Sequence, residues 1–339
     1  MKSRFGAANI KNFIGVLIGV ALIVVFISLI RLDVTGEKGS GLSKKYDYEI
    51  DFTIDPNLFL YTESAEPFNT GLTNSHAIAL DSQGSIYIAG DKAIRIFTEN
   101  GNLHDEIVLP DVPRSLTVAD DGKIYVSVKD HIEVYNRNGK QLASWKSLGY
   151  RALLTSIVVS GNNVFVADAG NRIVYRYDIN GNLINRIGKK DEDRNVPGFL
   201  VPSPYFDLVM RRDDLLRVVN PGRHHIEAYT FDGDFEFAWG KSSNSIEGFC
   251  GCCNPINIAV LKDDSFVTCE KGLARIKIYD PEGAFKGVVA GPEQFGATIH
   301  VCTTPEQCQS GGHDVAVDAQ DRIFVLDTLK NVVKIFSRK

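Results

Sequence analysis

Short runs of alternating apolar and polar residues fill most of the chain, and residues that favour turns bound each run. Six segments repeat one order of strand, turn, strand, turn and strand. They begin at His76, Arg114, Ser156, Phe206, Ile256 and His313. Alternation rich in β-branched and aromatic residues is typical of half-buried strands. A unit repeated at intervals of roughly forty to sixty residues predicts a repeat protein with an all-β fold.

A turn signal follows the third strand in five of the six segments. The pairs are Asn100-Gly101, Asn138-Gly139, Asn180-Gly181, Asp232-Gly233 and Glu282-Gly283. Such pairs favour tight hairpins in which both central residues take a positive φ, so five repeats are expected to have a fourth strand. The sixth repeat reaches Lys339 after its third strand. We expect Tyr48–Ile54 (YEIDFTI) to supply the missing strand and to pair with Val332–Phe336, because an open ring leaves an unpaired edge.

The repeats resemble NHL repeats, whose pattern is a strand ending in Ala-Val-Asp, then Gly-x-Ile-Tyr-Val-Ala-Asp, then Asn-x-Arg-Ile. The resemblance is clearest at Val315–Asp318 (VAVD) and at Val166–Ile173 (VADAGNRI). It covers roughly residues 76–336 and implies a six-bladed NHL-type β-propeller. Propellers include both binding proteins and enzymes, so the fold alone does not select an activity.

The N-terminal part of the chain carries one strongly apolar run. Phe13–Ile30 holds eighteen residues without a charge, which as a helix would span roughly 27 Å, and basic residues precede it. No small-residue cleavage site ends the run, which favours an uncleaved signal anchor. We expect a cytoplasmic tail at 1–12, a transmembrane helix at 13–31, a tether at 32–47 and a periplasmic or extracellular propeller at 48–339.

The charge balance bears on possible partners. Lys and Arg total 37 against 42 Asp and Glu, a net charge of −5. A nucleic-acid-binding protein usually carries a basic excess, so we expect no nucleic-acid partner. The expected partners are a membrane, through the N-terminal helix, and a protein at one face of the propeller.

Candidate chemistry gathers at one end of the expected central channel. The first residues of innermost strands surround the mouth of a propeller channel, and aligned repeats place His76, Arg114 and His313 there in three adjacent blades. Nitrogen-bearing side chains at a channel mouth are candidate ligand-binding residues. Polar residues at such positions also commonly contact only solvent.

Five of the six cysteines fall in two loops that should share this face. Cys250, Cys252 and Cys253 precede the fifth repeat, whereas Cys302 and Cys308 precede the sixth, near His300. Disulfides are one interpretation, since thiols oxidise outside the cytoplasm. Ligation of zinc or an iron–sulfur cluster is a second, and would favour electron transfer. Cys269 aligns with a strand end and is expected to be a single, partly buried thiol.

An enzymatic interpretation rests on resemblance. The placement of His76 and His313 resembles that in peptidylglycine amidating lyases, NHL-like propellers with histidine ligands around a central zinc. A catalytic zinc needs three protein ligands, and the alignment supplies two histidines. A lactonase-type site would need carboxylates around calcium, for which Asp207 and Asp314 are the candidates. We therefore expect a membrane-anchored binding or assembly module, with a redox protein and a zinc-dependent lyase as alternatives.

Overall fold

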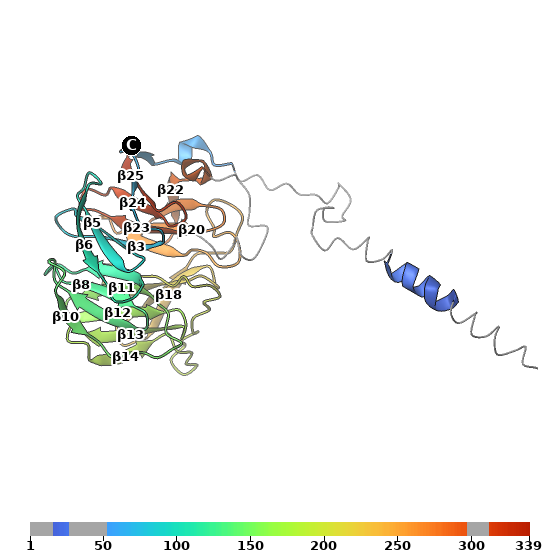
Figure 1. Cartoon of the computed structure of the whole chain (residues 1–339), viewed down its shortest axis with the longest axis horizontal. Helices are drawn as coiled ribbons and strands as arrows, with labels where there is room; N and C mark the ends of the chain where they lie inside the picture. The colour runs from blue at the N-terminus through green and yellow to red at the C-terminus, as the bar shows by residue number, and fades with distance from the viewer. Residues whose placement is uncertain (1–15, 27–52, 297–311) are drawn as a thin grey trace, which may run out of the picture. The chain divides into compact units, whose positions relative to one another are not determined.

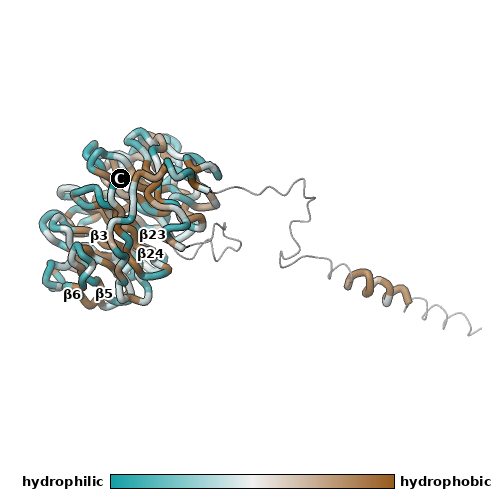
Figure 2. The backbone as a smooth tube through the Cα atoms, turned by 90° about the horizontal axis from the view of Figure 1, so that it is seen from above, coloured by the Kyte–Doolittle hydropathy of each residue, from teal (hydrophilic) through white to brown (hydrophobic). Residues whose placement is uncertain are grey.

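The computed structural model describes residues 16–26, 53–296 and 312–339 (Figure 1). Residues 16–26 form a helix that is mostly hydrophobic (Figure 2). Among the described residues, none of the helices meets the length and apolarity needed to cross a bilayer. The ends of the expected transmembrane segment, at 13–15 and 27–31, lie outside the described residues. The remaining described residues form a six-bladed β-propeller.

Six antiparallel sheets make up the blades. In chain order their strands are β3 (Ser75–Leu80), β4 (Ile86–Gly90), β5 (Ala93–Phe97), β6 (Leu103–Val108); β7 (Pro113–Val118), β8 (Ile124–Val128), β9 (His131–Tyr135), β10 (Gln141–Ser144); β11 (Leu154–Ser160), β12 (Asn163–Asp168), β13 (Ile173–Asp178), β14 (Leu183–Ile187); β15 (Leu208–Met210), β16 (Leu216–Asn220), β17 (His225–Tyr229), β18 (Phe235–Trp239); β19 (Asn257–Val260), β20 (Phe266–Glu270), β21 (Arg275–Tyr279), β22 (Phe285–Ala290); and β23 (His313–Val317), β24 (Ile323–Asp327), β25 (Val332–Arg338). The expected strands of all six repeats are confirmed. The innermost strands β3, β7, β11, β15, β19 and β23 contact one another in this order and close the ring.

A segment from the N-terminal side completes blade six, but not the one that the sequence predicted. The short strands β1 (Tyr61–Glu63) and β2 (Phe68–Asn69) both pair antiparallel with β25. Thr53 and Ile54 belong to no strand, whereas residues 48–52 lie outside the described part of the chain. The segment YEIDFTI alternates more clearly than β1 does. Pairing with β25, however, depends on contacts between residues far apart in the sequence, which local alternation does not predict. The backbone N–H of Lys339 donates to the carbonyl of Leu60 at 3.0 Å, which joins the two ends of the propeller.

The five glycine turns occur where expected, with a different geometry. Each glycine has a positive φ, between 74° at Gly139 and 91° at Gly233, whereas the residue before it does not. In blade one the N–H of Gly101 donates to the carbonyl of Thr98, and Phe97 then pairs with Leu103. These are three-residue hairpins with a type I turn and a bulge, in which glycine alone takes the left-handed conformation.

The core consists of layers between neighbouring blades. The second strand of a blade, such as β4 or β20, is buried along its whole length because a blade packs on each of its faces. Figure 2 shows the hydrophobic segments inside the propeller and hydrophilic ones at its outer turns. Two 3₁₀ turns flank this core, η2 (Pro56–Leu58) and η3 (Pro292–Phe295).

Candidate functional site

A cavity of about 610 Å³ lies at the centre of the propeller, and all six innermost strands line it. This volume is within the usual range for small-molecule sites. Residues of the connections before β3 and after β24, such as Asn74 and Leu329, also line it. In a propeller, these connections belong to the same face, so the cavity opens where the sequence placed the channel mouth.

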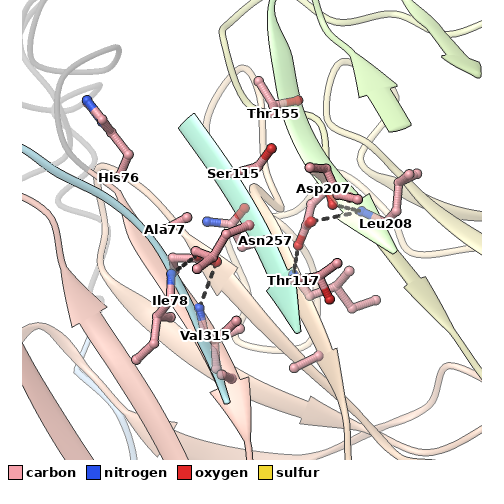
Figure 3. A pocket seen from close by; sticks show the side chains of 18 of the residues that line it. His76, Ala77, Ile78, Ser115, Thr117, Thr155, Asp207, Leu208, Asn257 and Val315 are labelled. Atoms are coloured by element: carbon pink, nitrogen blue, oxygen red, sulfur yellow. Dashed lines mark hydrogen bonds between the residues drawn. The ribbon is translucent and has the colours of Figure 1, made fainter. Parts of the chain in front are cut away.

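In five of the six blades, a polar side chain at one repeat position of the innermost strand bonds to the next innermost strand (Figure 3). The residues at this position are Ala77, Ser115, Ser156, Asp207, Asn257 and Asp314. Asp207 accepts the N–H of Ile258, and Asp314 accepts the N–H of Ile78, each at 2.8 Å. Asn257 Nδ2 donates to the carbonyl of His313 at 2.7 Å. The ring of side chains thus holds neighbouring blades together while it faces the cavity; Ala77 contributes no polar group.

The two carboxyl groups of this ring, Asp207 and Asp314, are weaker acids than ordinary aspartates. Burial raises the pKa of Asp207 to about 6, against hydrogen bonds that lower it. Burial, and next the charge of Asp207, raise the pKa of Asp314 to about 7. Near neutral pH one of the two groups therefore holds a proton for much of the time. The cavity wall can then donate as well as accept hydrogen bonds.

His76 and Arg114 lie at the mouth of the cavity, as the repeat alignment predicted. Burial, followed by the charge of Arg114, lowers the pKa of His76, so the imidazole is mostly neutral at pH 7. The Arg114 side chain is exposed. In Figure 3, His76 lies apart from Asp207 and Asn257. The cavity lining thus includes the positive charge of Arg114 as well as the carboxyl pair.

His313 occupies the position equivalent to His76 but does not line the cavity. It is 8% exposed, and its ring centroid lies 4.1 Å from that of Phe295 in η3. Neither ring nitrogen has a hydrogen-bond partner among the described residues, and burial lowers the pKa to about 4. The expected trio of His76, Arg114 and His313 is therefore a pair at the mouth and one buried histidine. Of the two histidines whose placement resembles that in amidating lyases, only His76 lines the cavity.

The loop before β19 brings Cys250, Cys252 and Cys253 together. Cys252 Sγ lies 3.3 Å from Cys253 Sγ, whereas Cys250 Sγ contacts Asn244 Oδ1 at 3.3 Å. Within the described ranges, the structure has neither a disulfide nor a group of three or more His, Cys, Asp or Glu residues able to hold a metal. Cys302, Cys308 and His300 lie outside the described residues. Cys269 is fully buried in β20, more deeply than expected.

A buried ion cluster fixes this loop. Glu270 accepts the N–H of Cys250 at 2.7 Å and pairs with Arg275 and Lys277. Lys277 Nζ in turn donates to the carbonyl of Gly248 at 2.6 Å. Because all three charged side chains are buried, their positions are set by these bonds, and the loop backbone is held with them.

Sequence reasoning missed two residues near these sites. Asn257 was not singled out, although the alignment that gave Asp207 and Asp314 puts it between them in blade five. Lys271 follows β20 and lies close to Cys253. The connection after β20 shares a face with the loop before β19, so the repeat geometry contained the signal that places Lys271 near Cys253.

Comparison with known proteins shows the fold. No family model and no curated protein matches the sequence. Among solved structures, a Bacteroides thetaiotaomicron protein of unknown function has a TM-score of 0.59 and 13% identity, over 82% of this chain and 73% of that one. Virginiamycin B lyase from Staphylococcus aureus has a TM-score of 0.55 and 13% identity, over 82% of this chain and 100% of that one. A gluconolactonase from Xanthomonas campestris has a TM-score of 0.56 and 15% identity, over 80% of this chain and 88% of that one. At these identities the likeness is one of fold.

Proposed function

We propose that the protein is a binding module whose central cavity takes a small, hydroxyl-rich anion. The observation that carries this proposal is the arrangement of charge along the cavity, with Arg114 at its mouth and the Asp207–Asp314 carboxyl pair on its wall. An arginine favours a carboxylate or phosphate. The carboxyl pair and Asn257 suit hydroxyl groups, which both donate and accept hydrogen bonds.

The experiment compares a charged sugar with a neutral one. Calorimetric titration of the full chain should show binding of gluconate that is tighter than binding of glucose. Arg114→Gln should weaken gluconate binding at least tenfold, about 1.4 kcal/mol, and leave glucose binding unchanged. Arg151→Gln is the matched control, because Arg151 is an exposed arginine of the loop before β11 that does not line the cavity. Equal losses in both variants, or no gluconate binding to the unaltered chain, would contradict the proposal.

The membrane anchor and the NHL relationship are also proposals. The uncharged run Phe13–Ile30 supports anchoring, with the propeller outside the cytoplasm, and the repeat motifs support an NHL-type propeller. A protein partner would bind the face that bears the cavity mouth. Anchoring predicts that the full chain stays in the membrane pellet after alkaline carbonate extraction, whereas a chain lacking residues 1–31 does not. Release of the full chain by carbonate would refute it.

A further inference from the structure

We propose that Cys253 is a nucleophilic thiolate that reacts with hydroperoxides. Its sulfur does not line the ligand cavity, although Tyr205, which lies against Lys271, does. The proposal is independent of the cavity ligand. It concerns Cys253 alone and rests on the polar groups that surround its sulfur.

Two buried polar atoms beside Cys253 lack an ordinary partner. Lys271 Nζ and Ser203 Oγ have no hydrogen-bond partner among the described residues. Lys271 is 5% exposed and Ser203 is 7% exposed. A buried ammonium without a counter-ion is costly, so a structure that retains one generally places a negative charge nearby. A thiolate at Cys253 supplies that charge.

The side chain of Asn254 holds the backbone around Cys253 close to the backbone of Lys271. The Asn254 side chain donates to the carbonyls of Cys250 and Lys271, at 2.6 and 3.0 Å. Its Oδ1 accepts the N–H of Lys271 at 2.9 Å. Three hydrogen bonds from one side chain therefore tie the cysteine loop to the turn after β20.

The charges around the sulfur favour ionisation. Burial raises the pKa of Cys253, but the nearby side chains of Ser203, Lys271 and Cys252 lower it and outweigh burial, so the net direction is downward. Tyr205 is a further titratable group near the sulfur, besides Lys271 and Cys252, and the Lys271 ammonium lies 4.7 Å from the centre of the Tyr205 ring. Burial, together with the charge of Cys253, raises the pKa of Tyr205, which keeps the phenol neutral.

Cys250 provides a comparison within the same loop. It is 6% exposed against 3% for Cys253, so the two thiols are almost equally buried. Burial raises the pKa of Cys250, and this direction prevails despite the nearby charge of Arg275. Any difference in reactivity between the two cysteines therefore reports charge and not access.

The reaction is a two-electron oxidation of the sulfur. The Cys253 thiolate attacks one oxygen of a hydroperoxide, an S–O bond forms and the O–O bond breaks. The second oxygen leaves as hydroxide or alkoxide and takes a proton from water, and Cys253 becomes a sulfenic acid. Hydrogen peroxide is little larger than water, which suits a side chain with so little exposed surface.

The test is site-resolved labelling of the full chain. Hydrogen peroxide is added to the folded chain and then removed with catalase, and dimedone is added in urea, so that its size does not limit access. Peptide mass spectrometry then follows the sulfenic acid at each cysteine. At pH 7, Cys253 should be labelled at least tenfold faster than Cys250. Lys271→Met should slow labelling of Cys253 at least tenfold at pH 7 and have little effect at pH 10, where the thiol ionises unaided. Lys271→Arg, which keeps the charge, should restore most of the rate.

Two results would overturn the proposal. One is equal labelling of Cys250 and Cys253 at pH 7, and the other is an unchanged rate in a folded Lys271→Met variant. If that variant does not fold, alkylation of the unaltered chain by iodoacetamide decides the question. The rate at Cys253 should reach half its maximum at a pH below the usual thiol pKa of about 8.5, and a midpoint at or above that pH would refute the proposal.

Discussion

Asp314→Asn should change how the stability of the propeller depends on pH. In the unfolded chain this carboxyl ionises near its ordinary pKa of 3.8, whereas in the folded protein the pKa is about 7. Between these two values the folded protein holds more protons than the unfolded chain. The free energy of unfolding must therefore fall as pH rises through this range.

The magnitude follows from the same two pKa values. A difference of one in pKa is worth about 1.4 kcal/mol, so full ionisation of Asp314 in the folded state would cost at most about 4 kcal/mol. Asp314 faces a cavity that is open to solvent, and water there screens the charge. We therefore expect a loss of roughly 2 kcal/mol between pH 5 and pH 8 from this group.

Asparagine removes the ionisation but also one acceptor. The two carboxyl oxygens accept the N–H groups of Ile78 and Val315, at 2.8 and 2.9 Å, and an amide has a single oxygen. The variant should thus be less stable than the unaltered chain at pH 5, by about 1–3 kcal/mol. As pH rises, the unaltered chain loses stability that the variant does not, so the two profiles should approach each other.

Urea unfolding at pH 5, 6, 7 and 8, followed by tryptophan fluorescence, measures this difference directly. Asp178→Asn is the control, because its carboxylate accepts hydrogen bonds from Asn182 and Asn180 that lower its pKa. Its contribution is present above the ordinary pKa and is lost only in acid, so that variant should follow the unaltered profile from pH 5 to 8. A constant gap between Asp314→Asn and the unaltered chain over this range would refute the reasoning.

Three further substitutions test the cysteine loop and the hairpins. Glu270→Gln leaves Arg275 and Lys277 buried without their counter-charge, and should reduce the free energy of unfolding by about 3–5 kcal/mol in urea titration; a loss below 1 kcal/mol would show that the cluster is not needed. Gly181→Ala places a Cβ 2.7 Å from the Trp145 ring at a φ of +85°, whereas Gly149→Ala meets no atom within 4 Å at +93°. Both should lower the melting temperature through backbone strain, and Gly181→Ala should lower it further; equal shifts would contradict the packing argument.

Local pattern was sufficient to predict the blades. Strands such as Ile124–Val128 and the turns at Gly101 and Gly139 are set by alternation and by glycine, which act over a few residues. The closing strand was not predictable in this way. Tyr61–Glu63 is three residues long, and it pairs with β25 because the ring brings it there.

The candidate site was predictable in position more than in chemistry. Repeat alignment located His76 and Arg114 at the mouth, yet the equivalent His313 is buried because Phe295 packs on it. Asp207 and Asp314 were visible as carboxyl groups, but the pKa values depend on burial and on the distance between blades. A sequence gives the residue at a repeat position and not the environment around it.

The pairing of β1 with β25 has a consequence for folding during synthesis on the ribosome. Blades one to five can each assemble as their own residues emerge, whereas blade six joins Thr62 to Ser337, near the two ends of the propeller. Until β25 has been made, the growing ring must expose the flanks of its first and last completed blades. These flanks are the surfaces most open to association with other chains. The ring can therefore close only after the last strand has left the ribosomal exit tunnel.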